Sequence, residues 1–75
     1  MKKVKIRIIG VNDIINFVEE AQKVESDVNM YKGRYVVDAK SILGVFSINT
    51  DTGVEIEYDE NEKDFEKYLQ RFCYT

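Results

Sequence analysis

The chain has 75 residues, which favours one domain spanning 1–75. Its net charge of −3 disfavours a dedicated nucleic-acid-binding role, because such proteins usually carry a basic patch. The sequence contains no histidine and one cysteine, Cys73, which excludes an intramolecular disulfide and a Cys/His zinc site. No cofactor and no metal are therefore expected, and stability must come from an aliphatic and aromatic core.

The N-terminal segment alternates apolar and charged residues and predicts a strand that ends at Gly10. Its apolar run is too short for a signal peptide, and no segment reaches the length of a membrane span. A soluble, cytoplasmic protein without membrane contact is expected, since a lone thiol also fits a reducing compartment. The inward set is Val4, Ile6 and Ile8, and the outward set is Lys3, Lys5 and Arg7.

A helix follows, with Asn12 as its expected N-cap, Asp13 in its first turn and its end near Glu25. Apolar residues recur at helical spacing on its expected buried side: Ile14, Ile15, Phe17, Val18, Ala21 and Val24. Residues 28–39 predict a hairpin that turns at Lys32-Gly33, because glycine permits a positive φ.

A short helix is expected over 41–47, then a loop over 49–53 and a strand over 54–58 with Glu55 and Glu57 outward. Asp59 and Glu62 have the spacing of a capping box for a last helix. Its expected buried stripe is Phe65, Tyr68, Leu69 and Phe72. The order β-α-β-β-α-β-α indicates an α+β fold, with the helices on one face of an antiparallel sheet.

Residues 40–48, Lys-Ser-Ile-Leu-Gly-Val-Phe-Ser-Ile, closely resemble the regulatory-serine segment of HPr, the phosphocarrier of the bacterial sugar phosphotransferase system. Gram-positive members of that family carry Lys-Ser-Ile-Met-Gly-Val-Met-Ser-Leu there. The sequence Asp-Val-Asn-Met at 27–30 is similar to the family's Asp-Val-Asn-Leu strand. The resemblance implies an open-faced β-sandwich of four antiparallel strands and three helices, with the first and last strands adjacent. The outward lysines and glutamates of those strands should then pair across the open face.

The same family carries a Gly-Ile-His-Ala-Arg-Pro motif in the loop before its first helix. This chain reads Ile-Ile-Gly-Val-Asn-Asp-Ile-Ile over 8–15 and has no histidine anywhere. A phosphohistidine relay needs an imidazole nitrogen, so this chain lacks carrier activity. No nucleophile–base pair is evident either, and no catalytic residue or enzyme activity is expected.

Ser41 has two compatible interpretations. Its hydroxyl is placed to cap the short helix, and the resemblance implies that it is also a regulatory phosphorylation site. Lys40 would add positive charge beside the phosphate. The resemblance further implies that Lys40, Ile42, Leu43 and Phe46 contact partner proteins, whereas Val45 is expected to point inward.

Two functions remain open from the sequence. One is a regulatory or adaptor protein that acts through the Ser41 helix. By resemblance its partners would be an HPr kinase/phosphorylase and a sugar-responsive transcription regulator. The other is a small structural or assembly subunit in which Ser41 only caps the helix.

Overall fold

The computed structural model describes residues 1–74, which form four strands and three α-helices. In chain order they are β1 (Lys2–Ile6), α1 (Val11–Gln22), β2 (Asn29–Lys32), β3 (Tyr35–Asp38), α2 (Ile42–Phe46), β4 (Val54–Tyr58) and α3 (Lys63–Leu69). A single 3-10 turn, η1 (Gln70–Phe72), continues α3. The predicted α+β class and element order are confirmed.

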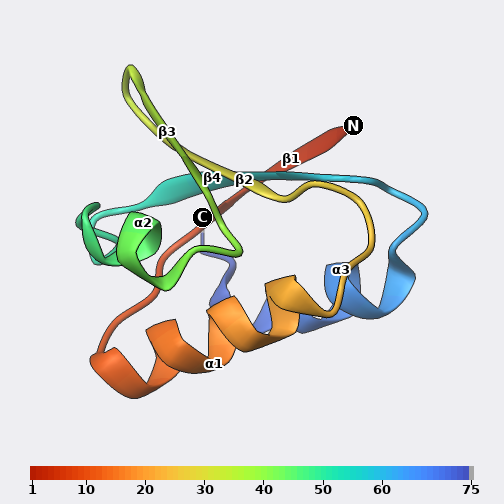
Figure 1. The fold of residues 1–75 in the computed structure, drawn as a ribbon, viewed down its shortest axis with the longest axis horizontal. Coiled ribbons are helices and arrows are strands. Elements are labelled where there is room, and N and C mark those ends of the chain that lie inside the picture. The colour runs from red at the N-terminus through yellow and green to blue at the C-terminus, as the bar shows by residue number, and fades with distance from the viewer. Residues whose placement is uncertain (75) are drawn as a thin grey trace.

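The sheet has the strand order β1-β4-β2-β3, and every neighbouring pair is antiparallel. The first and last strands are therefore adjacent, as the resemblance implied. The helices lie on one side of the sheet, and the other side is left open (Figure 1). Such an arrangement requires strands with one apolar and one polar face, which is the alternation seen in β1 and β4.

The core fills the space between the sheet and the helices. Its largest fully buried side chains are Tyr58, Phe17, Ile6, Ile8, Met30, Ile56, Leu69, Val28 and Val45. Around Phe17, the rings of Phe65 and Phe72 lie 6.2 and 6.4 Å away between centroids, in tilted and edge-to-face arrangements. These contacts anchor α3 and η1 to α1, since aromatic pairs favour such offset geometries. The predicted inward positions of β4 are confirmed.

The beginning of α1 differs from the prediction. The helix starts at Val11 rather than after Asn12, because Gly10 occupies the N-cap position with φ 93°. That positive φ turns the chain into the helix early, in a region that glycine enters freely. Asn12 therefore lies inside the first turn, and α1 ends at Gln22, three residues before the expected Glu25. Ile8 is buried as predicted but lies beyond the end of β1.

The capping box predicted for α3 does not form. The Asp59 carboxylate accepts a hydrogen bond from the backbone N–H of Asn61 at 2.9 Å, and Glu62 makes no side-chain cap. Aspartate often bonds the backbone two residues on, which stabilises a turn rather than a helix start. The helix accordingly begins only at Lys63.

The open face also differs from the expected charge pairing. The register places Lys3 opposite Glu57, but the Glu57 carboxylate accepts hydrogen bonds from Asn29 and Tyr31, at 3.2 and 2.9 Å. These two hydrogen bonds lower the pKa of Glu57. The Lys3 ammonium instead lies 4.4 Å from the centroid of the Tyr31 ring, a cation–π distance. Neutral neighbours on β2 thus take the place of the expected ion pair.

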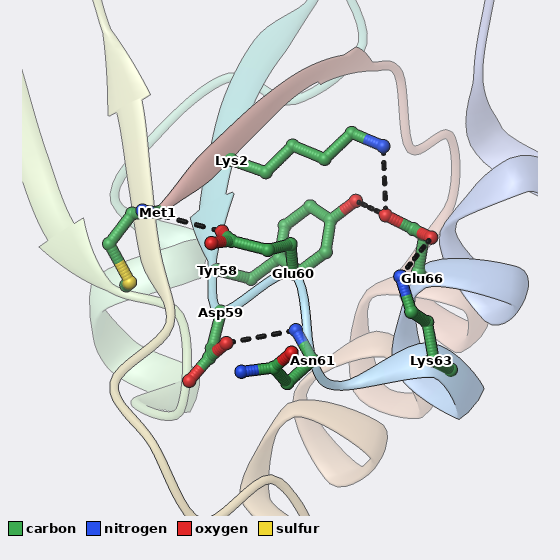
Figure 2. Close-up of polar contacts among 8 residues, drawn as sticks. All are labelled: Met1, Lys2, Tyr58, Asp59, Glu60, Asn61, Lys63 and Glu66. Atoms are coloured by element: carbon green, nitrogen blue, oxygen red, sulfur yellow. Dashed lines mark hydrogen bonds and ion pairs between the residues drawn. The ribbon is translucent and has the colours of Figure 1, made fainter.

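A polar cluster holds the start of β1 and the end of β4 against α3 (Figure 2). Glu66 accepts hydrogen bonds from the Tyr58 hydroxyl at 2.7 Å and the Lys2 ammonium at 2.9 Å. Lys63 adds an ion pair at 3.8 Å. The hydrogen bonds from Tyr58 and Lys2 lower the pKa of Glu66, and burial together with the bond to Glu66 raises the pKa of Tyr58.

Candidate functional site

Several hydrogen bonds hold the segment between β3 and α2 before the helix begins. The Asp38 carboxylate accepts from the Lys40 N–H at 2.9 Å, and the Asp38 carbonyl accepts from the Ser41 N–H at 3.0 Å. From α1, the Gln22 side-chain amide donates to the Lys40 carbonyl at 3.0 Å. Ser41 is thus positioned by local turn bonds and by a contact to a neighbouring helix.

Ser41 is the N-cap residue of α2. Its backbone is extended, with φ −99° and ψ 116°, and its hydroxyl oxygen accepts from the Gly44 N–H at 3.1 Å. The capping interpretation is confirmed. The side chain is also exposed to solvent, so capping does not bury the hydroxyl.

Gly44 keeps the space beside that hydroxyl open. A Cβ atom built at Gly44 would lie 3.4 Å from both Cβ and Oγ of Ser41 and 3.4 Å from the Asp38 carbonyl oxygen. Those distances are already contact distances, so any longer side chain at position 44 would crowd the serine. Glycine there leaves Ser41 accessible from the side of the helix.

Lys40 does not direct its charge at Ser41. Its ammonium donates to the Val24 carbonyl, 2.5 Å away, just after the end of α1. Lysine commonly satisfies carbonyl groups near helix C-termini in this way. The half-buried Lys40 therefore joins α1 to the segment before α2. The sequence analysis expected its charge beside Ser41, but the ammonium makes no direct contact with Ser41 here.

Three apolar side chains of α2 face solvent: Leu43 is 80% exposed, Phe46 44% and Ile42 37%. Val45 is fully buried, as expected, and is the helix residue that joins the core. A five-residue helix cannot turn all four apolar side chains inward. We call the exposed set Ile42, Leu43 and Phe46 the α2 surface.

Two residues of α1 extend the exposed apolar area, and sequence reasoning missed them. Val11 and Ile15 are 58% and 40% exposed, although Ile15 was expected in the core. They lie one helical turn apart, and Gln22, two turns after Ile15 on the same stripe, bonds the Lys40 carbonyl. That stripe of α1 therefore borders α2. The signal in the sequence was the repeat at 11, 15 and 22, beside the fully buried stripe.

The loop that carries histidine in the HPr family is occupied here by Gly10, Val11 and Asn12. Nearby is an open cavity of about 360 Å³ with Arg7, Asp13, Arg71 and Tyr74 among its lining residues. The Arg7 guanidinium stacks on the Tyr74 ring at 5.0 Å. This region offers cations and a carboxylate but no imidazole, so it cannot carry a phosphohistidine.

No group of three or more Asp, Glu or Cys side chains lies close enough together among residues 1–74 to hold a metal ion. In the same part of the chain, no helix combines the length and apolarity needed to cross a membrane.

Comparison with known proteins agrees with this geometry. The family profile described as "PTS HPr component phosphorylation site" matches residues 13–73. The HPr-like protein Crh of Bacillus subtilis (strain 168) is 32% identical over 75 residues, covering 96% of this chain and 88% of that protein.

Solved structures show the same fold. HPr-C-His from Thermoanaerobacter tengcongensis superposes with a TM-score of 0.77 at 28% identity, over 95% of this chain and 89% of that one. The phosphocarrier protein HPr from Bacillus anthracis str. Ames gives a TM-score of 0.68 at 26% identity, over 95% and 93% of the two chains. The profile, the relative and the folds agree, and the chain belongs to the HPr family.

Proposed function

We propose that this HPr-like protein is a regulatory or adaptor protein that acts through protein contacts at the α2 surface and not as a phosphohistidine carrier. The observation that carries the proposal is the pairing of an exposed, capping Ser41 with the exposed Leu43 on a helix of five residues. The absence of histidine from the sequence removes the alternative of a phosphoryl relay. No enzyme activity is included in the proposal.

Exposed apolar clusters rimmed by polar groups usually mark contact sites. The α2 surface meets this description, because its three apolar residues lie between the serines Ser41 and Ser47. Val11 and Ile15 on the bordering stripe of α1 would enlarge the contact area. The partner proposed from the resemblance is a sugar-responsive transcription regulator.

We further propose that Ser41 is phosphorylated by an HPr kinase/phosphorylase. The hydroxyl oxygen would attack the γ-phosphorus of ATP, releasing ADP and the hydroxyl proton. The product places a charge of about −1.5 to −2 beside three exposed apolar side chains. Such a change would alter which partners the α2 surface accepts, without requiring the fold to open.

The phosphorylation is tested by incubating the protein with HPr kinase, ATP and magnesium and measuring the intact mass. A gain of one phosphoryl group is expected, and Ser41→Ala should abolish it. Ser47→Ala is the matched control, because Ser47 lies at the other end of the same helix, where its hydroxyl donates to the Gly44 carbonyl. A gain that persists in Ser41→Ala contradicts the assignment.

The contact role is tested by titrating the transcription regulator with phosphorylated and unphosphorylated protein in a calorimeter. Binding of one form only, lost in Leu43→Ser and retained in Ile9→Ser, is expected. Ile9 is a fair control because it is exposed apolar surface outside α2. Equal binding of both forms would instead favour a structural or assembly subunit, in which Ser41 serves only as a helix cap.

A further inference from the structure

The two edges of the sheet are built differently. At the β1 edge, Ile6 forms a β-bridge with Cys73, and the Arg7 N–H donates to the Phe72 carbonyl at 3.0 Å. The same strand carries Lys2, Lys3 and Lys5. Lysines and added backbone contacts are common protection against edge-to-edge pairing.

The β3 edge lacks that protection. Within residues 1–74, β3 pairs with β2 on one side and with no strand on the other. Tyr35 is 69% exposed and Val36 54% exposed, and the β2–β3 hairpin extends away from the rest of the sheet (Figure 1). An exposed apolar edge strand is a template for pairing with another strand.

The turn fixes which backbone groups point outward. Gly33 has φ 59° and Arg34 a negative φ, so Lys32 and Tyr35 are joined by a two-residue turn of the II′ pattern. In such a hairpin the closing pair is hydrogen-bonded, and the alternation places Val37 in the next hydrogen-bonded pair. The N–H and C=O groups of Val36 therefore point away from β2, toward the free edge.

We propose that β3 pairs antiparallel with β3 of a second copy of this chain, about a two-fold axis that passes beside Val36. Val36 then lies directly opposite Val36 of the second copy, as a hydrogen-bonded pair. Arg34, the turn residue directly before β3, then lies beside Asp38 of the other copy, which gives two Arg–Asp ion pairs on the open face. Two sheets of four strands become one sheet of eight.

The charges select this register. Residues whose backbone N–H and C=O groups point toward the free edge must pair with residues of the same kind. This requirement leaves two-fold axes at positions 35, 36 or 37. An axis at 37 sets Arg34 opposite Lys40 of the second copy, a like-charge contact. An axis at 35 sets Arg34 opposite Val36. The position opposite Asp38 would then be 32, which lies on β2 beyond the Gly33-Arg34 turn, so Asp38 meets no cation. Only the axis at 36 pairs Arg34 with Asp38.

The helix-facing side of β3 is complementary as well. In this register Tyr35 lies directly across from Val37 of the second copy, and the two form a non-hydrogen-bonded pair with close side chains. A cavity of about 410 Å³ lies beside β3, lined by Lys32, Tyr35, Val36, Val37, Ser47, Ile48 and Asn49. Its apolar lining at Val37 and Ile48 suits an aromatic ring. In the proposed register, Tyr35 of the second copy lies next to this lining.

Charge reversal tests the pairing directly by sedimentation velocity. The wild-type protein is expected to form a concentration-dependent dimer. Arg34→Asp alone and Asp38→Arg alone should each be monomeric, because each places like charges opposite one another. An equimolar mixture of the two variants should recover a dimer, since both ion pairs are restored between unlike chains.

Asp38 also bonds the Lys40 N–H, so Asp38→Arg is checked by circular dichroism for folding. Should it not fold, Val36→Lys is the second variant, because symmetry places two ammonium groups face to face and predicts a monomer. Leu43→Lys, at an exposed site on α2, is the control that should still dimerise.

A wild-type protein that stays monomeric at a concentration on the order of 1 mM overturns the proposal, since the free energy of association is then weaker than about −4 kcal/mol. So does a dimer that Val36→Lys leaves intact and Leu43→Lys abolishes, which would place the interface on α2. A mixture of the charge-reversed variants that remains monomeric, with both variants folded, overturns it too.

Discussion

Helices α3 and α2 lie at opposite ends of the molecule (Figure 1), and the side chains at these two ends differ in how they are partnered. At the α3 end, Glu66 lies among Tyr58, Lys2 and Lys63, and each polar group has a partner of complementary charge or hydrogen-bonding type. At the α2 end, Leu43 and Phe46 expose apolar surface with no covering element among residues 1–74. The first arrangement stabilises the fold, and the second leaves apolar surface exposed for contact with another molecule.

The largest effect on stability is expected from Tyr58, whose ring is fully buried at the α3 end. Tyr58→Ala should lower the free energy of unfolding by about 3–5 kcal/mol, as truncation of buried aromatic residues usually does. Urea unfolding followed by circular dichroism measures the loss. A change below about 1 kcal/mol would contradict the structural role assigned to this end.

Ser41 should have an intermediate effect, because it caps α2 through the Gly44 N–H. Ser41→Ala is expected to cost about 1 kcal/mol, the usual value for loss of an N-cap. Ser41→Asn retains a capping oxygen and should cost only a few tenths of that amount. Equal losses in the two variants would show that the cap does not stabilise the helix.

The ionisation of Glu66 should produce a smaller, pH-dependent effect. Its pKa is lower in the folded protein than in the unfolded chain, because Tyr58 and Lys2 bond the carboxylate. The stability it contributes is therefore present above the unfolded value of about 4.3 and is lost as the pH falls through the folded pKa.

Glu66→Gln should lose less stability than the wild-type protein when the pH is lowered from 7 to 3. The comparison is made by urea unfolding at both pH values. Glu57→Gln provides a parallel case, since hydrogen bonds from Asn29 and Tyr31 also lower the pKa of Glu57. Identical acid sensitivity in Glu66→Gln and the wild-type protein would contradict the assigned contacts.

The smallest effect on stability is expected at the α2 surface. Leu43→Ser should change the free energy of unfolding by no more than about 0.5 kcal/mol, because the side chain is 80% exposed. Thermal unfolding checks this. A loss comparable to that of a core truncation would mean that Leu43 is structural, and the contrast between the two ends would fail.

The fold class could be predicted because the strand and helix patterns agree over most of the chain, and the sheet order could be predicted because the chain resembles the HPr family. Alternation in β4 matched the buried set, and the helical spacing of α1 matched it at every predicted position except Ile15. The starts of the helices were harder to predict from the sequence, because they depend on the backbone conformation of single residues. Gly10 adopts a positive φ and starts α1 early, and the Asp59 turn delays α3.

The candidate site was predicted only partly for a similar reason. The cap at Ser41 could be predicted because it depends on residues three positions apart. The contact of Lys40 with the Val24 carbonyl could not, since it joins residues that only the packing of α1 beside α2 brings together. Ile15 was misplaced because its position borders the buried stripe, where helical periodicity alone does not decide exposure.

The central claim is that function runs through Ser41 and the α2 surface. Its most direct test is the rate of phosphorylation by HPr kinase, with the modified residue located by peptide mass spectrometry. We expect one phosphoryl group on Ser41 in the wild-type protein. We also expect at least about tenfold slower modification of folded Leu43→Ser, equivalent to a loss of about 1.4 kcal/mol in transition-state stabilisation. No phosphate on Ser41, or an unchanged rate in Leu43→Ser, would contradict the central claim.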